Sequence, residues 1–353
     1  MYHSAPETYQ ERSLDELRPV IQEHRERLGR KLVILTHHYQ RKEVVRLGDI
    51  VGDSYYLARR AAEEKEAEYI VFCGVHFMAE AARILCRPGQ RVFLPNLYAG
   101  CPMADMAPID TVTDAWEHVG GADTIPISYM NSAASLKAFV GDHGGLICTS
   151  ANAHKAFTWG FQRAQRVFFF PDENLGYNTA HNLGIPDDEI LVCDPANSAW
   201  KQQLTERTRV ILWKGHCHVH TNFRPEHITQ MRERFPGVKI VVHPECLPEV
   251  VQRADAVGST SFIVNYVKEQ PTGARIAIGT ELNLVSRLAE DYPDKTVMEL
   301  SGLSCSLCIN MFRTTLADVA YTLDCLGRTN EIFVEPEIQH SARLALERML
   351  ELN

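Results

Sequence analysis

The sequence contains no apolar run that approaches the length of a membrane span, and no block of like charge interrupts it. Its 45 acidic residues outnumber its 36 lysines and arginines, which gives a net charge of −9. Nucleic acids and anionic membrane surfaces are bound by basic faces, so this balance argues against both as partners. Residues 1–13 are polar and lack the apolar core of a signal peptide. We therefore expect a soluble, cytoplasmic protein.

The ten cysteines are too sparse for the disulfide framework of a small secreted protein, and no C-x2-C-x2-C run of a ferredoxin-type electron carrier occurs. Cys73, Cys148 and Cys193 lie in or beside apolar, strand-like runs, as expected for buried packing thiols. Three others instead follow turn-like glycine or polar steps, and these are Cys101, Cys217 and Cys308.

One stretch, Lys214–His220, holds a thiol and three imidazoles within five residues, directly after the apolar run Val210–Trp213. That run predicts a buried strand, and open α/β folds build their sites at strand ends. Taken alone, the stretch fits either a histidine-rich surface loop or a zinc or iron site. One enzyme reading is therefore a zinc hydrolase with the ligands His216, Cys217, His218 and His220.

The same succession of elements occurs three times along the chain. Each time, a short strand ends in a polar motif and a helix follows. The spans His37 to Ser54 and His243 to Thr260 both cover 17 positions. Alternating strands and helices predict an α/β fold with parallel sheets covered on both faces. We expect three related three-layer α/β/α domains in a pseudo-threefold arrangement, over residues 1–115 with an N-terminal helix and Cys101, 116–225 with Cys217, and 226–353 with Cys308 and a C-terminal helix.

One cysteine in each repeat allows three thiolates to meet at one centre. Three ligands leave one metal position open, which suits catalysis. A set of thiolates favours zinc or an iron–sulfur cluster.

Ten motifs, in the right order between about residues 31 and 316, resemble the quinolinate synthase (quinolinate synthetase A) family. They are Leu35–Gln40, Gly52–Ser54, Phe77–Glu80, Ala99–Met106, Tyr129–Asn131, Cys148–Asn152, Pro171–Gly176, Gly215–His220, His243–Cys246 and Gly258–Ser261. The resemblance implies three α/β domains around a central [4Fe–4S] cluster. It also implies condensation of iminosuccinate with dihydroxyacetone phosphate to quinolinate, phosphate and water, a step of NAD biosynthesis. L-aspartate oxidase is then a possible partner that supplies the imine.

By this resemblance the cluster ligands are Cys101, Cys217 and Cys308. Cys305 competes for the third place, because the family usually has proline after the ligand and Ile309 stands there instead. Cys308 is favoured because the following Asn310-Met311 keeps it in register with the family. A Cys305–Cys308 disulfide that competes with the cluster is a further hypothesis.

The substrates are anions, yet few basic residues lie near the motifs, so neutral side chains and backbone N–H groups should bind them. The resemblance implies a substrate site of His37, Ser54, Tyr129, Met130, Asn131, Ser150, His243, Pro244, Glu245 and Thr260. For Ser54, Ser150 and Thr260 the alternative role is that of a helix N-cap.

Glu245 is the candidate general base, since a carboxylate beside His243 in an anion-binding cavity should have a raised pKa. Its alternative role is that of a helix-start residue beside Pro244. Tyr39, Tyr129 and His243 complete the candidate catalytic set, with the tyrosines as proton donors. A non-enzymatic alternative, a cluster-based sensor of iron or oxygen, would usually bring a basic DNA-binding face, which this acidic sequence lacks.

Overall fold

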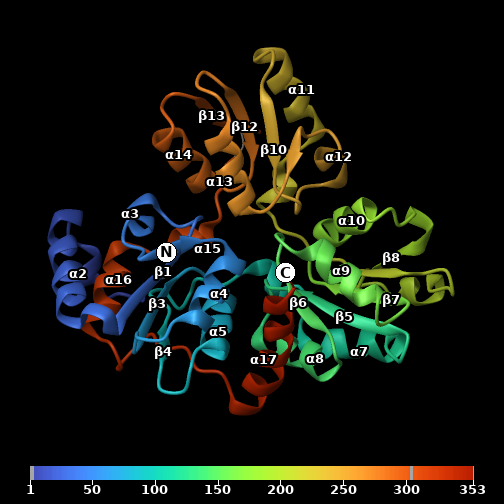
Figure 1. The fold of residues 1–353 in the computed structure, drawn as a ribbon, viewed down its shortest axis with the longest axis horizontal. Coiled ribbons are helices and arrows are strands. Elements are labelled where there is room, and N and C mark those ends of the chain that lie inside the picture. The colour runs from blue at the N-terminus through green and yellow to red at the C-terminus, as the bar shows by residue number, and fades with distance from the viewer. Residues whose placement is uncertain (1–3, 303–304, 353) are drawn as a thin grey trace. The chain divides into compact units, whose positions relative to one another are not determined.

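The structure is a computed structural model that describes residues 4–302 and 305–352 (Figure 1). The chain forms three sheets, and every pairing between named strands is parallel. Helices alternate with the strands along the chain. The predicted α/β class, with three parallel sheets flanked by helices, is confirmed. No helix in the described ranges combines the length and the apolar character that crossing a membrane requires.

The chain divides into two compact units. Unit 1 comprises Met1–Cys101 and Leu307–Glu335, and unit 2 comprises Pro102–Ser306 and Pro336–Asn353. Unit 1 contains one sheet and unit 2 contains two. The division into domains at residues 115 and 225 stays a prediction.

Unit 1 is built on a sheet of strand order β2-β1-β3-β4. Its strands are β1 (Leu32–His37), β2 (Ile50–Gly52), β3 (Tyr69–Cys73) and β4 (Arg91–Phe93). Its helices are α1 (Glu7–Gln10), α2 (Leu14–Leu28), α3 (Lys42–Val45), α4 (Ser54–Glu63), α5 (His76–Leu85), α15 (Ile309–Arg313) and α16 (Leu316–Asp324), with a 3-10 turn at Gly29–Lys31. Helix α2 starts with a capping box, in which the Glu16 carboxylate accepts from the Ser13 backbone N–H at 2.8 Å.

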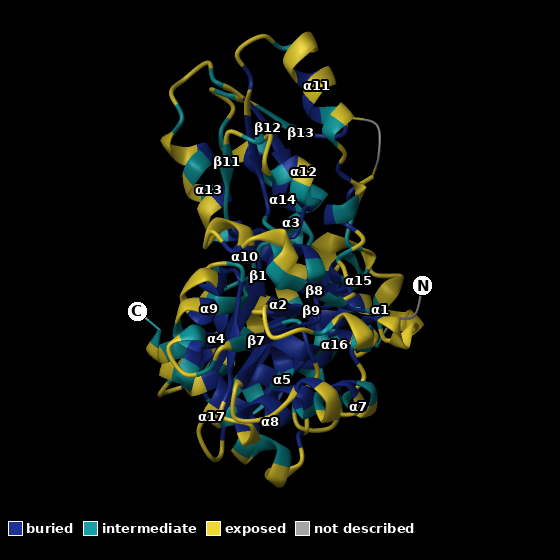
Figure 2. Cartoon of the chain, turned by 90° about the vertical axis from the view of Figure 1, so that its right-hand side faces the viewer, coloured by how far each residue is buried: buried dark blue, intermediate teal, exposed yellow. Residues whose placement is uncertain are grey.

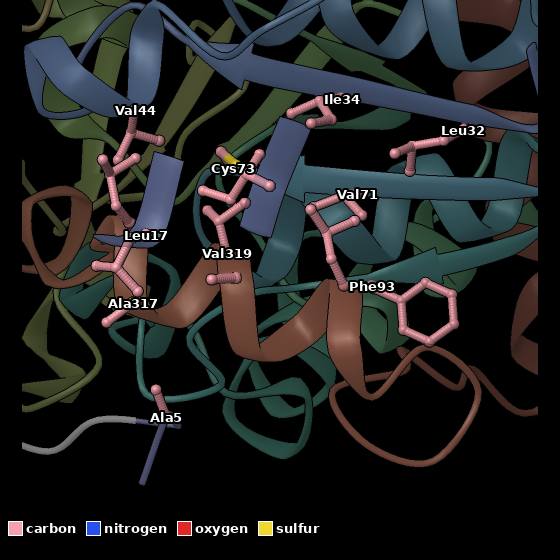
Figure 3. Close-up of a cluster of buried hydrophobic side chains, with 14 residues drawn as sticks. Ala5, Leu17, Leu32, Ile34, Val44, Val71, Cys73, Phe93, Ala317 and Val319 are labelled. Carbon is pink, nitrogen blue, oxygen red and sulfur yellow. The ribbon is translucent and has the colours of Figure 1, made fainter. Parts of the chain in front are cut away.

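The core of unit 1 joins the first and last parts of its chain. Figure 3 shows Leu17 of α2, Cys73 of β3 and Val319 of α16 in one cluster of buried side chains. All six residues of β1 are buried. Cover on both faces is the reason why the first four residues of this strand, Leu32–Leu35, form a continuous apolar run rather than an alternating one.

The first sheet of unit 2 has the order β6-β5-β7-β9-β8. Its strands are β5 (Thr124–Tyr129), β6 (Leu146–Cys148), β7 (Arg166–Phe170), β8 (Ile190–Cys193) and β9 (Val210–Trp213). The helices around it are α6 (Pro102–Asp105), α7 (Ile109–Val119), α8 (Ala134–Asp142), α9 (Ala153–Phe161), α10 (Glu173–Asn182) and α17 (Pro336–Glu351), with 3-10 turns at Asp187–Glu189, Ser198–Gln203 and η4 (His220–Asn222). Figure 2 shows β7 and β9 in the dark blue of buried residues.

The second sheet of unit 2 has the order β11-β10-β12-β13. Its strands are β10 (Lys239–Val242), β11 (Ala256–Val257), β12 (Arg275–Gly279) and β13 (Thr296–Glu299). Its helices are α11 (Pro225–Arg234), α12 (Pro248–Val251), α13 (Thr260–Glu269) and α14 (Leu282–Asp291).

One hydrogen-bond pattern recurs in the unit 1 sheet and in this last sheet. The Asp49 carboxylate accepts from the Ile34 N–H at 2.8 Å, and the Asp255 carboxylate accepts from the Ile240 N–H at 2.8 Å. Each aspartate N–H also donates back to the same strand residue. In both places an arginine of the preceding helix pairs with the other carboxylate oxygen, namely Arg25 and Arg232. The internal repeat predicted from spacing therefore extends to its hydrogen bonds.

The C-terminal helix α17 packs on α8. A Cβ placed on Gly141 of α8 would lie 1.9 Å from the Ser341 carbonyl oxygen of α17, so only glycine permits this close approach. Arg348 of α17 donates to the Gly145 carbonyl at 2.6 Å. The last helix is thus part of the helical layer that covers the first sheet of unit 2.

Candidate active site

A buried carboxylate, Glu245, lies at the centre of a hydrogen-bonded network in unit 2. It follows β10 directly, and only 2% of its surface is exposed. The Tyr129 hydroxyl, at the end of β5, donates to its Oε1 at 2.5 Å. His220 Nδ1, from η4 after β9, lies 2.9 Å from its Oε2. Three strand ends of unit 2 therefore contribute to one site, as the α/β reading predicts.

The environment of His220 fixes the position of its ring proton. An ionised carboxylate only accepts, so Nδ1 carries the proton that points to Glu245. Nε2 then accepts from the Thr280 hydroxyl, 3.1 Å away at the end of β12. The resemblance to the quinolinate synthase family assigned no role to His220, which appeared only among the ligands of the zinc-hydrolase alternative. Its signal was the spacing from Cys217, because a helical turn, in which the Thr221 N–H donates to the Cys217 carbonyl at 3.0 Å, brings the two side chains together.

His243 is held as a neutral donor. Its Nδ1 accepts from the Glu245 N–H at 3.4 Å, and its Nε2 lies 3.1 Å from the Ser150 hydroxyl. Burial and the neighbouring His220 lower the pKa of His243 to about 3, although Glu245 opposes this shift. A neutral ring whose Nδ1 accepts must carry its proton on Nε2, facing Ser150.

The raised pKa expected for Glu245 is wrong. Burial raises the pKa of this carboxyl, but the electrostatic interactions with the His220 and His243 rings and the hydrogen bonds from His220 and Tyr129 outweigh burial and lower it to about 2. Glu245 is therefore an anion in this network. The nearby carboxyl of Asp172 has the opposite shift, since burial and the charge of Glu245 raise its pKa well above the usual range.

His37 of unit 1 lies in the same kind of turn as His243. The Tyr39 N–H donates to His37 Nδ1 at 3.1 Å, and the rings of the two residues meet edge to face with centroids 4.8 Å apart. Nε2 of His37 therefore carries its proton. His37 is buried and Tyr39 is half-buried.

The predicted hydroxyl residues do not act as N-caps. Ser54 and Thr260 are the first residues of α4 and α13, where the caps are Asp53 and Ser259. Ser150 lies two residues before Asn152, which is the N-cap of α9. The alternative role of these hydroxyls as caps is wrong.

The other predicted substrate residues lie at the ends of β5 and β10. Met130 is buried, and its N–H donates to the Cys148 carbonyl at 2.7 Å. The Oδ1 atom of Asn131 is buried and has no hydrogen-bond partner among the described residues. Such an atom needs a donor, and a ligand would supply one. The Pro244 carbonyl accepts from Asn178 at 2.9 Å.

All three predicted cluster cysteines are half-buried. Cys101 ends the first segment of unit 1, and Cys308 is the N-cap of α15 in its second segment. Cys217 belongs to unit 2, where its N–H donates to the buried Asp172 carboxylate at 3.2 Å. Cys305 is exposed, and neither it nor Cys308 forms a disulfide.

Cys217 is also one of three residues of unit 2 that could together hold a metal ion. Its Sγ, a ring nitrogen of His220 and a carboxylate oxygen of Glu245 all lie within 4.8 Å of one another. His216 and His218 are exposed and do not belong to this group. The described residues therefore do not form the predicted zinc site with four ligands in one loop.

Parallel α/β sheets whose strand ends gather a buried carboxylate, two imidazoles and a thiol define an α/β protein with a candidate active site that could hold a metal ion. A family model described as Quinolinate synthetase A protein matches residues 20–351. The quinolinate synthase of Acidobacterium capsulatum is 50% identical over 340 residues, which cover 93% of this chain and 91% of the relative. That of Anoxybacillus flavithermus is 46% identical over 356 residues, covering 99% and 97%. That of Corynebacterium glutamicum is 48% identical over 354 residues, covering 98% and 90%. The chain belongs to the quinolinate synthase family, as its motifs predict, and it is an enzyme.

Proposed function

We propose that the enzyme condenses iminosuccinate with dihydroxyacetone phosphate to quinolinate, phosphate and water, in the route to NAD. Membership of the quinolinate synthase family supports the reaction. The observation that carries the proposal is the buried Tyr129–Glu245–His220 network, which brings proton-transfer groups together in a site with neutral hydrogen-bond donors.

Cys101, Cys217 and Cys308 hold a [4Fe–4S] cluster in this proposal. Their half-buried thiols suit the role better than Cys148, whose pKa is raised by complete burial. Thiolates are the ligands of such clusters, and three of them leave one iron without a protein ligand. When bound, the cluster supplies a Lewis acid for loss of the substrate hydroxyl.

Neutral groups bind the substrate anions. His243 Nε2–H donates to the Ser150 hydroxyl oxygen at 3.1 Å and so orients this hydroxyl, whose own proton can donate to a substrate anion. Thr260 starts α13, where helix N–H groups favour a negative charge. The full set proposed to line the substrate site is His37, Ser54, Tyr129, Met130, Asn131, Ser150, His243, Pro244, Glu245 and Thr260.

Glu245 takes a proton from the substrate, and Tyr129 returns one through its hydroxyl. With a pKa near 2, the Glu245 carboxylate alone is a weak base. Entry of dicarboxylate and phosphate anions places like charge beside it, which raises its pKa toward the working pH. Tyr39 and His243 are the remaining proposed catalytic residues, the first as a proton donor and the second as a fixed donor.

The test is an assay of anaerobically purified protein with aspartate-derived imine and dihydroxyacetone phosphate, after iron and sulfide have been counted. We expect about four of each per chain and formation of quinolinate. A chain that holds the cluster but makes no quinolinate would contradict the reaction and leave the cofactor intact. A chain that purifies with zinc in place of iron and hydrolyses amide or ester bonds would support the hydrolase alternative.

A further inference from the structure

We propose that the cluster-free enzyme binds one divalent transition-metal ion, of the class of Zn²⁺, through Cys217, His220 and Glu245. The three ligand atoms already lie within 4.8 Å of one another. They come from the loop after β9, from η4 and from the turn after β10, all in unit 2. The site therefore needs nothing from unit 1.

The donor set selects the class of metal. Sulfur, nitrogen and oxygen donors together suit zinc and its neighbours in the first transition row, whereas magnesium and calcium prefer oxygen alone. Bonds of about 2.0–2.3 Å to zinc imply separations of roughly 3.2–3.8 Å between ligand atoms in a tetrahedron. Side-chain shifts of about 1 Å would close the present arrangement around such an ion.

The charges also match a dication. A thiolate and the Glu245 carboxylate carry two negative charges, and the imidazole of His220 is a neutral ligand once the metal has replaced its Nδ1 proton and Nε2–H donates to Thr280 instead. His220 and Glu245 are each only 2% exposed. Two anionic ligands in so buried a place are stabilised by a bound dication, which cancels their charge.

Groups around the three ligands hold them in place. Tyr129 donates to Glu245, Thr280 lies 3.1 Å from His220 Nε2, and Asp172 accepts from the Cys217 N–H. Partners of this kind orient metal ligands and strengthen binding. The surroundings of the site are thus built before a metal arrives.

One consequence rests on the proposed function, because it requires Cys217 to be a cluster ligand. A thiolate already bound to zinc is not available for the cluster, so the two occupants exclude each other. Zinc-bound enzyme would then be inactive, and it could not take up the cluster until the zinc ion leaves.

The experiment titrates Co²⁺, a spectroscopic substitute for Zn²⁺, into cluster-free enzyme under anaerobic conditions. We expect one equivalent to bind with a thiolate-to-cobalt charge-transfer band, which Zn²⁺ then abolishes. Removing an outer-sphere partner weakens metal sites by about 10–100-fold, so His220→Gln and Glu245→Gln should each weaken binding by at least about 100-fold. Circular dichroism checks that each variant is folded. Because Glu245→Gln preserves size and shape, it answers the question if His220→Gln does not fold.

His216→Gln and His218→Gln are the matched controls, since both histidines are exposed in the same loop and should not alter cobalt affinity. Absence of the band overturns the site, and so does an unchanged band in both ligand variants. Loss of cobalt binding in the control variants would overturn the proposed site, because it would show that the exposed histidines of the loop bind the metal.

Competition is measured separately, by reconstitution with iron and sulfide after zinc has been added. Zinc should suppress cluster uptake by the wild-type chain but not by His220→Gln. Equal uptake with and without zinc in the wild type would overturn the exclusion. Failure to make quinolinate contradicts the proposed reaction instead, and it leaves the cobalt result unaffected.

Discussion

The imidazole rings of His220 and His243 stack with their centroids 4.4 Å apart and their planes inclined by 20°. Two imidazolium cations at this distance would repel each other by about 4 kcal/mol at an effective dielectric constant of about 20. The pair therefore resists a second positive charge, and Glu245 touches both residues. The protonation of His243 and Glu245 therefore depends on the neighbouring side chains of this network.

Removing the charge of Glu245 should remove proton transfer. We expect Glu245→Gln to lower kcat by about 10²–10⁴-fold, the usual contribution of a positioned acid–base group. The amide keeps an oxygen for Tyr129, so the fold and the cluster content should persist. Steady-state kinetics of cluster-loaded protein measures the effect.

Glu249→Gln is the control for that variant, because Glu249 is an exposed carboxylate of the neighbouring helix α12. It should retain wild-type kcat. A Glu245→Gln enzyme with kcat within a factor of two of the wild type would contradict the assignment of the base.

The low pKa of His243 predicts a loss of stability in acid. The unfolded chain takes up a proton on this residue below about pH 6.5, whereas the folded chain does so only near pH 3. Folding stability therefore falls as the pH drops through this window, by up to about 1.4 kcal/mol per pH unit. Urea unfolding should show that the wild type loses roughly 2 kcal/mol more than His243→Gln between about pH 7 and pH 5. Identical pH profiles of the two proteins would contradict the shift.

The proposed ligand set predicts different outcomes for two cysteines of unit 2. Cys217→Ser should reduce iron and sulfide to background, because a serine hydroxyl is not a thiolate ligand. Cys148→Ser should keep the cluster, since Cys148 is completely buried in β6 and burial raises its pKa. Iron and sulfide analysis after anaerobic reconstitution separates the two. Retention of a full cluster by Cys217→Ser would overturn the assignment.

The contact between α8 and α17 makes a prediction about stability alone. Gly141→Ala places a methyl group 1.9 Å from the Ser341 carbonyl oxygen, so the helices must move apart. We expect a loss of about 1–3 kcal/mol in the free energy of unfolding. Ser135→Ala, at a half-buried position of the same helix, serves as the control and should change little. A Gly141→Ala protein with wild-type stability would show that the two helices do not pack this closely.

The strands were predictable from sequence because buried parallel strands are short apolar runs. Val210–Trp213 was identified in this way, and the spacing of the polar motifs revealed the repeat. The edge strand β8 was not identified as a strand in its own right. Its burial alternates between buried and half-buried residues, so its apolar signal is weaker.

The error at Glu245 arises from contacts that sequence distance hides. Tyr129 lies 116 residues away and His220 lies 25 residues away, and these two side chains donate to the carboxylate. The sequence indicated only that His243 lies two positions before Glu245 and that the cavity should bind anions. The electrostatic interactions with His220 and His243 and the hydrogen bonds from His220 and Tyr129, which lower the pKa of Glu245, become visible only in the fold.

The turns at His37 and His243 also bear on the history of the chain. A segment copied within one gene carries its hydrogen-bond geometry with it, so each copy starts with an imidazole already oriented by its own backbone. Two positions after this histidine, one copy has Tyr39 and the other has Glu245. This difference leaves a neutral phenol in one loop and an anion in the other. Two loops that share this turn but differ in their side chains thus give unit 1 and unit 2 different chemistry at equivalent positions.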